Sequence, residues 1–373
     1  MQKIVPAFLI LFEFFFCFCR CSAGELNWPI KEHFSIAAHF SDYQNYADIP
    51  YWHGGIDLVA PSGTEVFSPV SGEVKIYSYK IDASRNPRKF GYLRTDYGSL
   101  SYNEFYKNLD STEERYIEVS IIDKWKNNWM FRHIAHKTIP AALISLPQSV
   151  RRVSSGDLIG KITRWNDTVY PSLQTYHHIH LEIVDKNGVY LNPAKLMKPF
   201  LDSEPPLIKK IWITENESEN AILSHHAPIP SVKGKIDILA QIEDTNDTGC
   251  YITGPYMIKM ALSKFQNEKW EYIEQFRDIV KFDVLPVTGD RTKMVEALYK
   301  DRVIEKGKTF RSEGNSKLRT AIYNLTNGTP DKGYYPDNSL DTSSLAPGHY
   351  CAVIEAYDIG GNISTGTILF KKE

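Results

Sequence analysis

The sequence has little cysteine, almost no net charge and no long apolar run beyond its N-terminus. Lysine and arginine total 43 against 45 aspartates and glutamates, which gives a formal net charge of −2. This balance offers no basic surface for nucleic acid and no long-range attraction to anionic membranes. No repeat of fixed period or low-complexity tract is visible, and a hydrophobic content of 42% argues against disorder. We therefore expect a folded, soluble chain, and 373 residues suggest two folded units.

Residues 1–23 have the composition of a signal peptide. Lys3 provides a positive start, Ile4–Phe18 is apolar apart from Glu13, and Cys21-Ser22-Ala23 ends the segment with small residues. The apolar run is short for a membrane span, and a glutamate inside it would be costly in lipid. We expect cleavage at the end of this segment, no transmembrane span in the mature chain, and export to the periplasm, the cell envelope or the medium.

Cysteine usage fits export. Three of the five cysteines lie in the predicted signal peptide: Cys17, Cys19 and Cys21. A lipid anchor on one of them is the alternative to free secretion, but their bulky and charged neighbours fit a lipoprotein cleavage site badly. Cys250 and Cys351 remain, and two cysteines in an exported chain suggest one disulfide, with two free thiols as the alternative. Because residues 24–249 contain no thiol, a metal ion there must be held by histidine, aspartate or glutamate.

Segments rich in β-branched and aromatic residues recur along the chain between turn residues, which predicts an all-β fold of antiparallel strands. The expected strands are Gly72–Tyr79, Tyr116–Asp123, Leu158–Thr163, His178–Val184, Ile208–Ile213, Lys235–Gln241, Tyr256–Leu262, Tyr350–Tyr357 and Thr365–Phe370. Two adjacent prolines, Pro205-Pro206, cannot continue a central strand and mark a linker. We therefore predict one domain over residues 24–204 and a second over 207–373, the latter a β-sandwich of immunoglobulin or fibronectin type. Within it, residues 291–345 are polar and unassigned, apart from a short helix over Arg291–Asp301.

The first candidate metal-binding segment is His53-Gly54-Gly55-Ile56-Asp57. Two adjacent glycines disfavour a helix, at about 1 kcal/mol each relative to alanine. In an extended strand the segment would span about 13 Å, too far for both side chains to bind one ion. The glycines permit a tight bend that can bring the histidine and the aspartate to one point. Taken alone, such a segment is more often an ordinary surface turn.

The second candidate is His178-Ile179-His180, which opens an apolar stretch. Residues two apart on a strand project from the same face, with α-carbons about 6.6 Å apart. Both imidazoles can therefore enter one cavity while Ile179 points into the core. One of them can bind a metal while the other reaches a water or a substrate on that metal. An exposed pair of strand histidines is the alternative, and His177 would point to the opposite face.

A further histidine, His133, is a candidate site residue only because the other two segments are present. It lies in the largely apolar segment Trp129–Ile134, where a lone histidine is more often a hydrogen-bonded core residue. The other histidines have no such company, and we expect them to be ordinary loop or core residues, although His39 could line a groove. They are His33, His39, His136 and the pair His225-His226.

Together these segments resemble the lysostaphin-like (LytM-type) zinc endopeptidases that cut bacterial peptidoglycan. The resemblance covers about residues 53–196 and rests on several short motifs that occur in the order of the family. They are His53-x-Gly55-x-Asp57, Ala60-Pro61-Ser62-Gly63-Thr64, Pro69-Val70-Ser71-Gly72-Glu73-Val74, Phe131-Arg132-His133-Ile134, Gly156-Asp157-Leu158-Ile159-Gly160, His178-Ile179-His180-Leu181-Glu182-Ile183 and Asn192-Pro193. One departure is Arg132, which stands where a small residue is more usual and could influence substrate choice.

The resemblance implies an antiparallel-sheet peptidase domain with one zinc ion per chain, held by His53, Asp57 and His180. It also implies that His133 and His178 are the catalytic histidines. Three nitrogen or oxygen ligands with one open position are typical of a catalytic zinc site. Water in that position has its pKa lowered to about 7. A neighbouring histidine can then act as general base or stabilise the oxyanion, and the sequence leaves open which one does which.

We therefore expect a zinc metalloendopeptidase whose substrate is peptidoglycan or another peptide, with no nucleic-acid partner. The sandwich is expected to be an accessory domain that positions the enzyme or binds a cell-envelope partner. Two alternatives stay open: a non-catalytic relative that regulates another cell-wall hydrolase, and a secreted peptidase that acts on proteins. The presence of all five site residues argues against the first alternative, and nothing in the sequence excludes the second.

Overall fold

The computed structural model describes residues 25–45, 50–81, 92–96, 117–165, 168–169, 174–223, 229–245, 251–285, 291–315, 318–327 and 338–373. Within these ranges most residues in regular structure are in strands, which confirms the predicted all-β class. The predicted signal peptide (residues 1–23), Cys250 and His225-His226 lie outside the described residues. Among the helices in the described ranges, none has the length and apolar character needed to cross a membrane.

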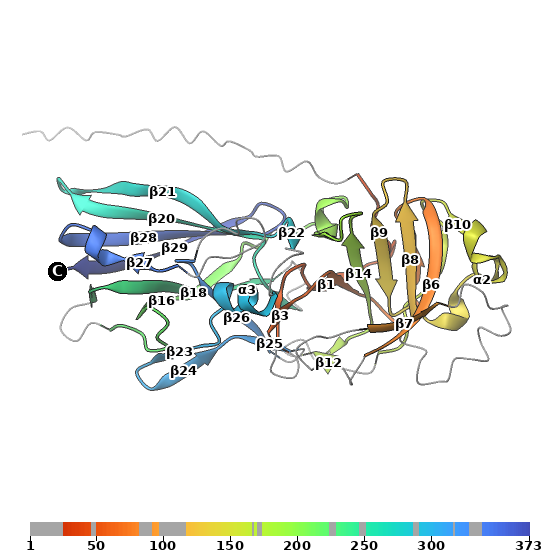
Figure 1. Cartoon of the computed structure of the whole chain (residues 1–373), viewed down its shortest axis with the longest axis horizontal. Helices are drawn as coiled ribbons and strands as arrows, with labels where there is room; N and C mark the ends of the chain where they lie inside the picture. The colour runs from red at the N-terminus through yellow and green to blue at the C-terminus, as the bar shows by residue number, and fades with distance from the viewer. Residues whose placement is uncertain are drawn as a thin grey trace, which may run out of the picture.

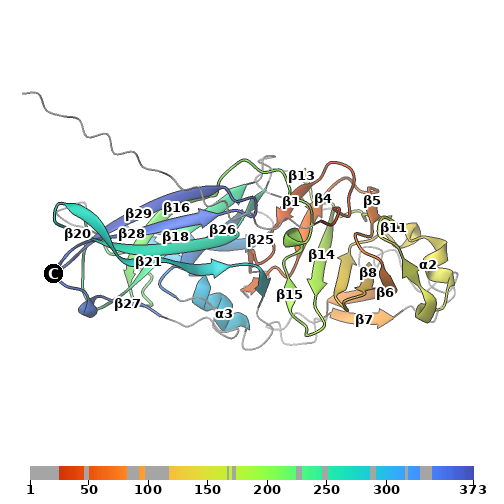
Figure 2. The ribbon, with the colours of Figure 1, turned by 90° about the horizontal axis from the view of Figure 1, so that it is seen from above.

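Most of the N-terminal half of the chain contributes to a ten-stranded sheet, on the right of Figure 1, with the order β1-β4-β14-β9-β8-β6-β10. Its strands are β1 (Ser35–Ala38), β4 (Ile56–Val59), β14 (His178–Val184), β9 (Asn128–Arg132), β8 (Ile117–Asp123), β6 (Gly72–Ile81) and β10 (Arg152–Val153), with β7 (Tyr92–Asp96) beside β6, β15 (Tyr190–Leu191) beside β14 and β22 (Val284–Leu285) beside β15. All of these strands pair antiparallel. Strands β4 and β14 are neighbours (Figure 2), so the two candidate metal-binding segments meet.

Shorter elements surround this sheet. Three small ladders pair β2 (Tyr43–Gln44) with β3 (Tyr51–Trp52), β5 (Glu65–Phe67) with β11 (Leu158–Lys161), and β12 (Thr168–Val169) with β13 (Gln174–Thr175). The helical turns are η2 (His136–Thr138), α2 (Ala141–Ser145), η3 (Gln148–Val150) and η4 (Pro193–Lys195). Because β3 ends at Trp52 and β4 begins at Ile56, the bend predicted at the two glycines lies between these strands.

Burial with a period of two explains how the sheet serves both stability and chemistry. In β8 and β14 every second residue is a fully buried aliphatic: Ile117, Val119, Ile121, Ile179, Leu181 and Ile183. Burying each such side chain stabilises the fold by about 1.5–3 kcal/mol. Most of the alternate positions are polar and also buried or nearly so, and they include Glu118, His178, His180 and Glu182. One face of these strands therefore supplies hydrophobic stability and the other carries polar groups.

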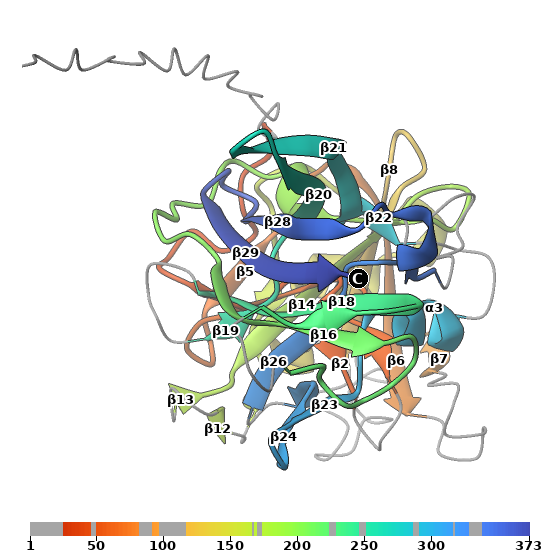
Figure 3. The same cartoon turned by 90° about the vertical axis from the view of Figure 1, so that its left-hand side faces the viewer.

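From residue 207 onward, the described chain forms mainly two facing sheets (Figures 1 and 3). The first has the order β16-β18-β26-β25 with β19 and β27 beside β18, and the second has the order β17-β29-β28-β20-β21. The strands are β16 (Leu207–Glu215), β17 (Ser231–Val232), β18 (Lys235–Thr245), β19 (Ile252–Thr253), β20 (Met257–Gln266), β21 (Lys269–Lys281), β25 (Glu313–Asn315), β26 (Leu318–Asn324), β27 (Leu340–Asp341), β28 (Gly348–Tyr357) and β29 (Ile363–Lys372). The pair β17 and β29 is parallel. Gly366 of β29 leaves room for Ile208 and Ile211 of β16, so the sheets pack as a sandwich.

The strands expected from the sequence are all present, with small differences at their ends. The unassigned stretch 291–345 contains the helix α3 (Arg291–Leu298), the hairpin of β23 (Arg302–Glu305) and β24 (Lys308–Arg311), the turn η5 (Thr342–Ser344), and strands β25 to β27. The long strand β21 is not predicted by the sequence pattern, because most of its side chains are exposed and show no apolar alternation.

The predicted disulfide is not formed. Cys351 is a free, buried thiol in the middle of β28, between its partners Ser263 of β20 and Leu369 of β29. Burial raises the pKa of this thiol. A cysteine in that place behaves as a small core residue, which is the alternative that the sequence left open.

The predicted division at Pro205-Pro206 falls between η4 and β16, and it stays a prediction. The two parts share contacts. Strand β22 pairs with β15 and so adds to the N-terminal sheet from beyond the linker. The backbone N–H of Gly254 donates to Asp42 at 2.8 Å, and the hydroxyl of Tyr299 donates to the carbonyl of Ser41 at 3.0 Å. The sandwich therefore touches the segment that leads into the first candidate motif.

Candidate metal centre

The bend between β3 and β4 brings His53 and Asp57 together. A Cβ added at Gly55 would lie 2.2 Å from the carbonyl oxygen of Leu181, so the backbone of the bend lies directly against β14. The φ of Gly55 is not positive, so backbone conformation does not require a glycine here. The close approach to β14 requires it, because no side chain would fit between the two backbones. The result is a distance of 3.2 Å between Nε2 of His53 and Oδ1 of Asp57. The sequence expectation of a glycine-permitted bend is met.

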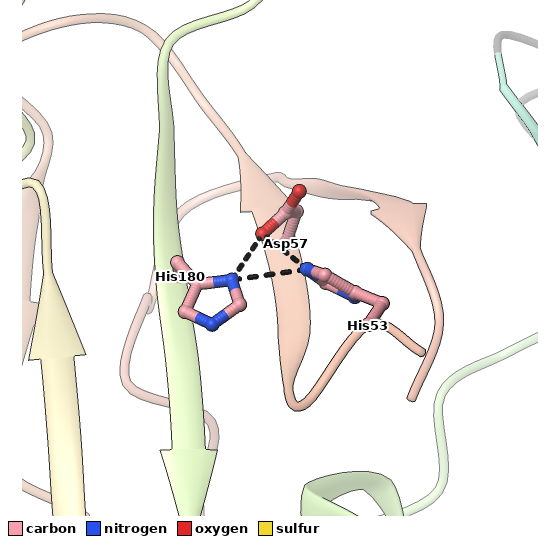
Figure 4. Close-up of side chains that lie close together, drawn as sticks. All are labelled: His53, Asp57 and His180. Carbon is pink, nitrogen blue, oxygen red and sulfur yellow. Dashed lines mark hydrogen bonds and ion pairs between the residues drawn. The ribbon is translucent and has the colours of Figure 1, made fainter. Parts of the chain in front are cut away.

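Strand β14 supplies the third ligand candidate. His180 lies directly opposite Asp57 in the ladder between β14 and β4. Its Nδ1 is 2.8 Å from Oδ1 of Asp57 and 3.0 Å from Nε2 of His53 (Figure 4). Three potential ligand atoms thus converge in a site where His53 and Asp57 are buried and His180 is nearly so.

This arrangement fits a metal ion. Zinc bonds of about 2.0–2.1 Å in tetrahedral geometry place ligand atoms about 3.3 Å apart, close to the separations of 2.8–3.2 Å found here. The second nitrogen of each histidine also has a partner. Nδ1 of His53 lies 3.0 Å from the carbonyl oxygen of His39, and Nε2 of His180 lies 3.0 Å from Oε1 of Glu182. Such partners fix the ring and its tautomer in metal-binding histidines.

The two candidate catalytic histidines lie beside this cluster. Nε2 of His178 is 3.8 Å from Oδ1 of Asp57. The ring of His133 is 4.6 Å from that of His178, measured between centroids, and 6.4 Å from that of His180. His133 follows β9 rather than lying in it, and its φ of 70° is uncommon for a residue with a side chain. All five predicted site residues are therefore close together, while the roles assigned to them stay predictions.

His177 takes no part in the cluster. Its Nδ1 accepts a hydrogen bond from the backbone N–H of Trp165 at 2.9 Å. This agrees with the opposite-face orientation expected from the strand period.

Three further residues act on the site without being predicted from the sequence: His39, Tyr176 and Glu182. His39 was expected to be an ordinary residue, yet its carbonyl contacts His53. The carbonyl of Tyr176 contacts Nδ1 of His178 at 3.2 Å. A signal existed for Glu182, because it is two residues beyond His180 on one strand and so shares its face.

Arg132 is buried and lies directly opposite the candidate ligand His180 in the ladder between β9 and β14. Its Nε donates to Glu118 at 2.9 Å, and its two terminal nitrogens donate to Glu182 at 2.7 and 2.9 Å. Since Glu182 also contacts His180, this arginine reaches the candidate ligand His180 through one intermediary. Its position gives no support to the expected influence on substrate choice.

Electrostatics within the cluster follow from burial and neighbouring charges. Burial alone would raise the pKa of Asp57, but the surrounding histidines lower it well below its usual range. Burial lowers the pKa of His178 to about 4, so this ring is neutral at pH 7. For His180 burial is outweighed by Asp57 and Glu182, which raise its pKa to about 9. A metal that binds at neutral pH must therefore displace a proton from His180.

No family model and no curated protein matches the sequence. Among solved structures, a protein from Pseudomonas aeruginosa described as a peptidase M23 is similar to this chain, with 18% sequence identity and a TM-score of 0.27. The match covers 47% of this chain and 51% of that one, so the chain spans about half the length of that protein. A likeness of this size does not bear on function, which rests on the residues of the site.

Proposed function

We propose that the protein is a zinc metalloendopeptidase that hydrolyses peptide bonds in bacterial peptidoglycan. The observation that carries this proposal is the convergence of ligand atoms from His53, Asp57 and His180, 2.8–3.2 Å apart, beside two further histidines. Two nitrogen ligands and one carboxylate form a donor set that suits zinc. The choice of substrate comes from the sequence resemblance to lysostaphin-like endopeptidases, and the expected export is consistent with it.

His178 is placed to act as general base. Zinc held by the three ligands would polarise a peptide carbonyl and lower the pKa of a bound water to about 7. The Nδ1 of His178 faces the carbonyl oxygen of Tyr176 at 3.2 Å, so this nitrogen carries the ring proton. Nε2 then keeps a free lone pair, and it is the nitrogen that faces the metal ligands. It can accept a proton from the attacking water and return it to the leaving amine.

We assign the stabilisation of the oxyanion to His133. Its ring packs against Trp165 with centroids 4.7 Å apart and against His178 at 4.6 Å. A φ of 70° costs a non-glycine residue about 1–3 kcal/mol, and such strain concentrates at functional sites. From this position an N–H of the ring can donate to a developing negative charge beside the metal.

Zinc analysis of the purified protein tests the metal site. We expect one zinc ion per chain in the wild type and little zinc in His53→Ala and His180→Ala. His349→Ala is the matched control, because His349 is an exposed histidine on β28 in the sandwich. Undiminished zinc in both ligand variants would contradict the assignment.

Digestion of purified peptidoglycan and of an unfolded protein such as casein tests the substrate. The proposal predicts release of peptides from peptidoglycan and loss of that activity in His180→Ala. Cleavage of casein alone would favour a peptidase that acts on proteins. A protein that binds zinc but cleaves neither substrate would overturn the proposed activity and favour a regulatory relative.

A further inference from the structure

The carboxylate of Asp57 is held from both of its oxygens. Oδ1 faces the other two ligand atoms, Nδ1 of His180 and Nε2 of His53. Oδ2 accepts a hydrogen bond from the hydroxyl of Tyr176. Both Asp57 and Tyr176 are buried, at 4% and 5% exposure. The tyrosine therefore fixes which oxygen is presented to the metal.

Arg319 of the sandwich strand β26 extends this contact. Its Nη2 donates to the hydroxyl oxygen of Tyr176 at 3.2 Å, and its side chain is buried. An arginine can only donate hydrogen bonds, and an ionised carboxylate can only accept them. The hydroxyl between them accepts from Arg319, so its single proton is directed to Asp57. The direction of the chain from Arg319 through Tyr176 to Asp57 is thus fixed by chemistry.

The same arginine also reaches the strand beside Asp57. Strand β1 pairs with β4 through a bulge, in which Ile36 faces Leu58, Ala38 faces Asp57 and Ala37 has no counterpart. Nη1 of Arg319 donates to the carbonyl oxygen of Ala37. One guanidinium therefore holds the side chain of Asp57 through Tyr176 and the backbone next to it through the bulge.

Residues of the sandwich also brace the loop that carries a second ligand. The backbone N–H of His53 donates to the carbonyl of Asp42 at 2.9 Å, and that of Ser41 donates to the carbonyl of His53 at 2.8 Å. This loop is in turn held by Gly254, which donates to the side chain of Asp42, and by Tyr299, which donates to the carbonyl of Ser41. Two of the three candidate ligands, Asp57 and His53, are thus each linked to the sandwich through a single intervening residue.

We propose that Tyr176 and Arg319 are positioning residues for Asp57, so that metal affinity depends on the sandwich. The inference rests on the proposed function, because it requires a metal at His53, Asp57 and His180. The sandwich is then a part of the metal centre in addition to any accessory role. Loss of an outer partner of this kind typically weakens metal binding about 10–100-fold.

Tyr176→Phe in the full-length protein is the most direct test, since it removes the hydroxyl but keeps the ring and the carbonyl that contacts His178. We expect the dissociation constant for zinc, measured by competition with a chromogenic chelator, to rise about 10–100-fold. Tyr350→Phe is the matched control, because it removes a tyrosine hydroxyl that binds the carbonyl of Ala346 in the sandwich. It should leave the constant unchanged. An unchanged constant in Tyr176→Phe would overturn the proposal.

Arg319→Met tests whether the arginine affects the metal site through Tyr176. Arg302→Met is the control, because it also removes an arginine, one whose partner is the carboxylate of Glu219 at 2.6 Å. We expect weaker zinc binding in Arg319→Met only. In the double variant with Tyr176→Phe, the loss of affinity should be smaller than the two single effects combined. Both substitutions break the chain through Tyr176, and only Arg319→Met also loses the bond to Ala37. Fully additive effects would contradict the chain.

Unfolding by urea in excess chelator separates positioning from stability. If Arg319 were merely structural, Arg319→Met would lower the urea midpoint while the folded protein kept its zinc affinity, and the proposal would fail. A wild type that binds no zinc would overturn the proposed function and this inference with it. A wild type that binds zinc, with unchanged affinity in both variants, would overturn the inference alone.

Discussion

The N-terminal sheet and the sandwich are both built from antiparallel strands, yet the rows of residues that cross them differ in chemistry. Across β4, β14, β9 and β8, residues directly opposite one another are Asp57, His180, Arg132 and Glu118. Across β20, β28 and β29, a comparable row is Leu262, Ala352 and Ile368. The first row is polar or charged throughout, and the second is entirely apolar.

The difference shows how the molecule separates stability from chemistry. An apolar row gains from the area that it removes from water, and each member contributes independently of charge. A buried charged row is tolerated only while every member has a partner, because an unpaired buried charge is costly. The polar row therefore makes the N-terminal sheet sensitive to single changes, and it also holds two of the three candidate metal ligands, Asp57 and His180.

The largest effect is expected on turnover, when either of the two candidate catalytic histidines is replaced. His178→Ala or His133→Ala should lower the turnover of a peptidoglycan peptide by about 10²–10⁴, while zinc and fold are retained, because each histidine acts on the water or the transition state. His177→Ala is a matched control, since its ring faces away from the cluster. Kinetics and zinc content measured on the same preparations decide the matter, and near-normal turnover in either variant would show that its role is misassigned.

The next prediction compares two ion pairs of the same sheet. Arg132→Met leaves Glu118 buried without its cation and Glu182 with His180 as its remaining partner, and we expect the free energy of unfolding to fall by about 3–5 kcal/mol. Arg152→Met removes an exposed pair with Glu73, 3.1 Å long, and should cost less than about 1 kcal/mol. Urea denaturation measures both. Equal losses of unfolding free energy in the two variants would contradict the expected difference between a buried and an exposed ion pair.

A smaller effect is expected at a buried carboxyl of the sandwich. Burial, with Asp358 and Asp202 nearby, raises the pKa of Asp244 to about 8 from an ordinary value of 3.8. Between about pH 4 and pH 8 the folded state then binds more protons than the unfolded state, so this group's contribution to stability is lost as pH rises. Asp244→Asn removes that loss, and its stability relative to the wild type should increase from pH 5 to pH 8. Urea unfolding at both pH values checks this, and a difference that does not vary with pH would contradict it.

Local properties of the chain predicted how four of the candidate residues lie in two pairs, and the resemblance to lysostaphin-like endopeptidases predicted that these pairs meet beside His133. A glycine pair allows a bend between His53 and Asp57, and the strand period puts His178 and His180 on one face. The main strands were equally accessible, since their β-branched and aromatic residues form continuous runs. An exposed edge strand such as β21 lacks that pattern and could not be recognised.

The two arginines that support the site, Arg319 and Arg132, could not be predicted, because their contacts join segments that are far apart in the sequence. Arg319 meets Ala37 across 282 positions of sequence, and only the packing of β26 against β1 and its bulge brings them together. The partners of Arg132 depend on the register of three strands. No pattern within a short window encodes such relations, so the sequence suggested an influence of Arg132 on substrate choice and gave no sign of its buried ion pairs.

The bend at Gly55 has a consequence for how the protein tolerates mutation. The distance between the strand that carries Asp57 and the strand that carries His180 is set there by backbone against backbone, and Leu181 cannot rotate away from an added methyl group. A random search for inactive variants should therefore recover position 55 together with the candidate metal ligands. A residue with no side chain would behave genetically as a member of the metal site, although it contributes no atom to the chemistry.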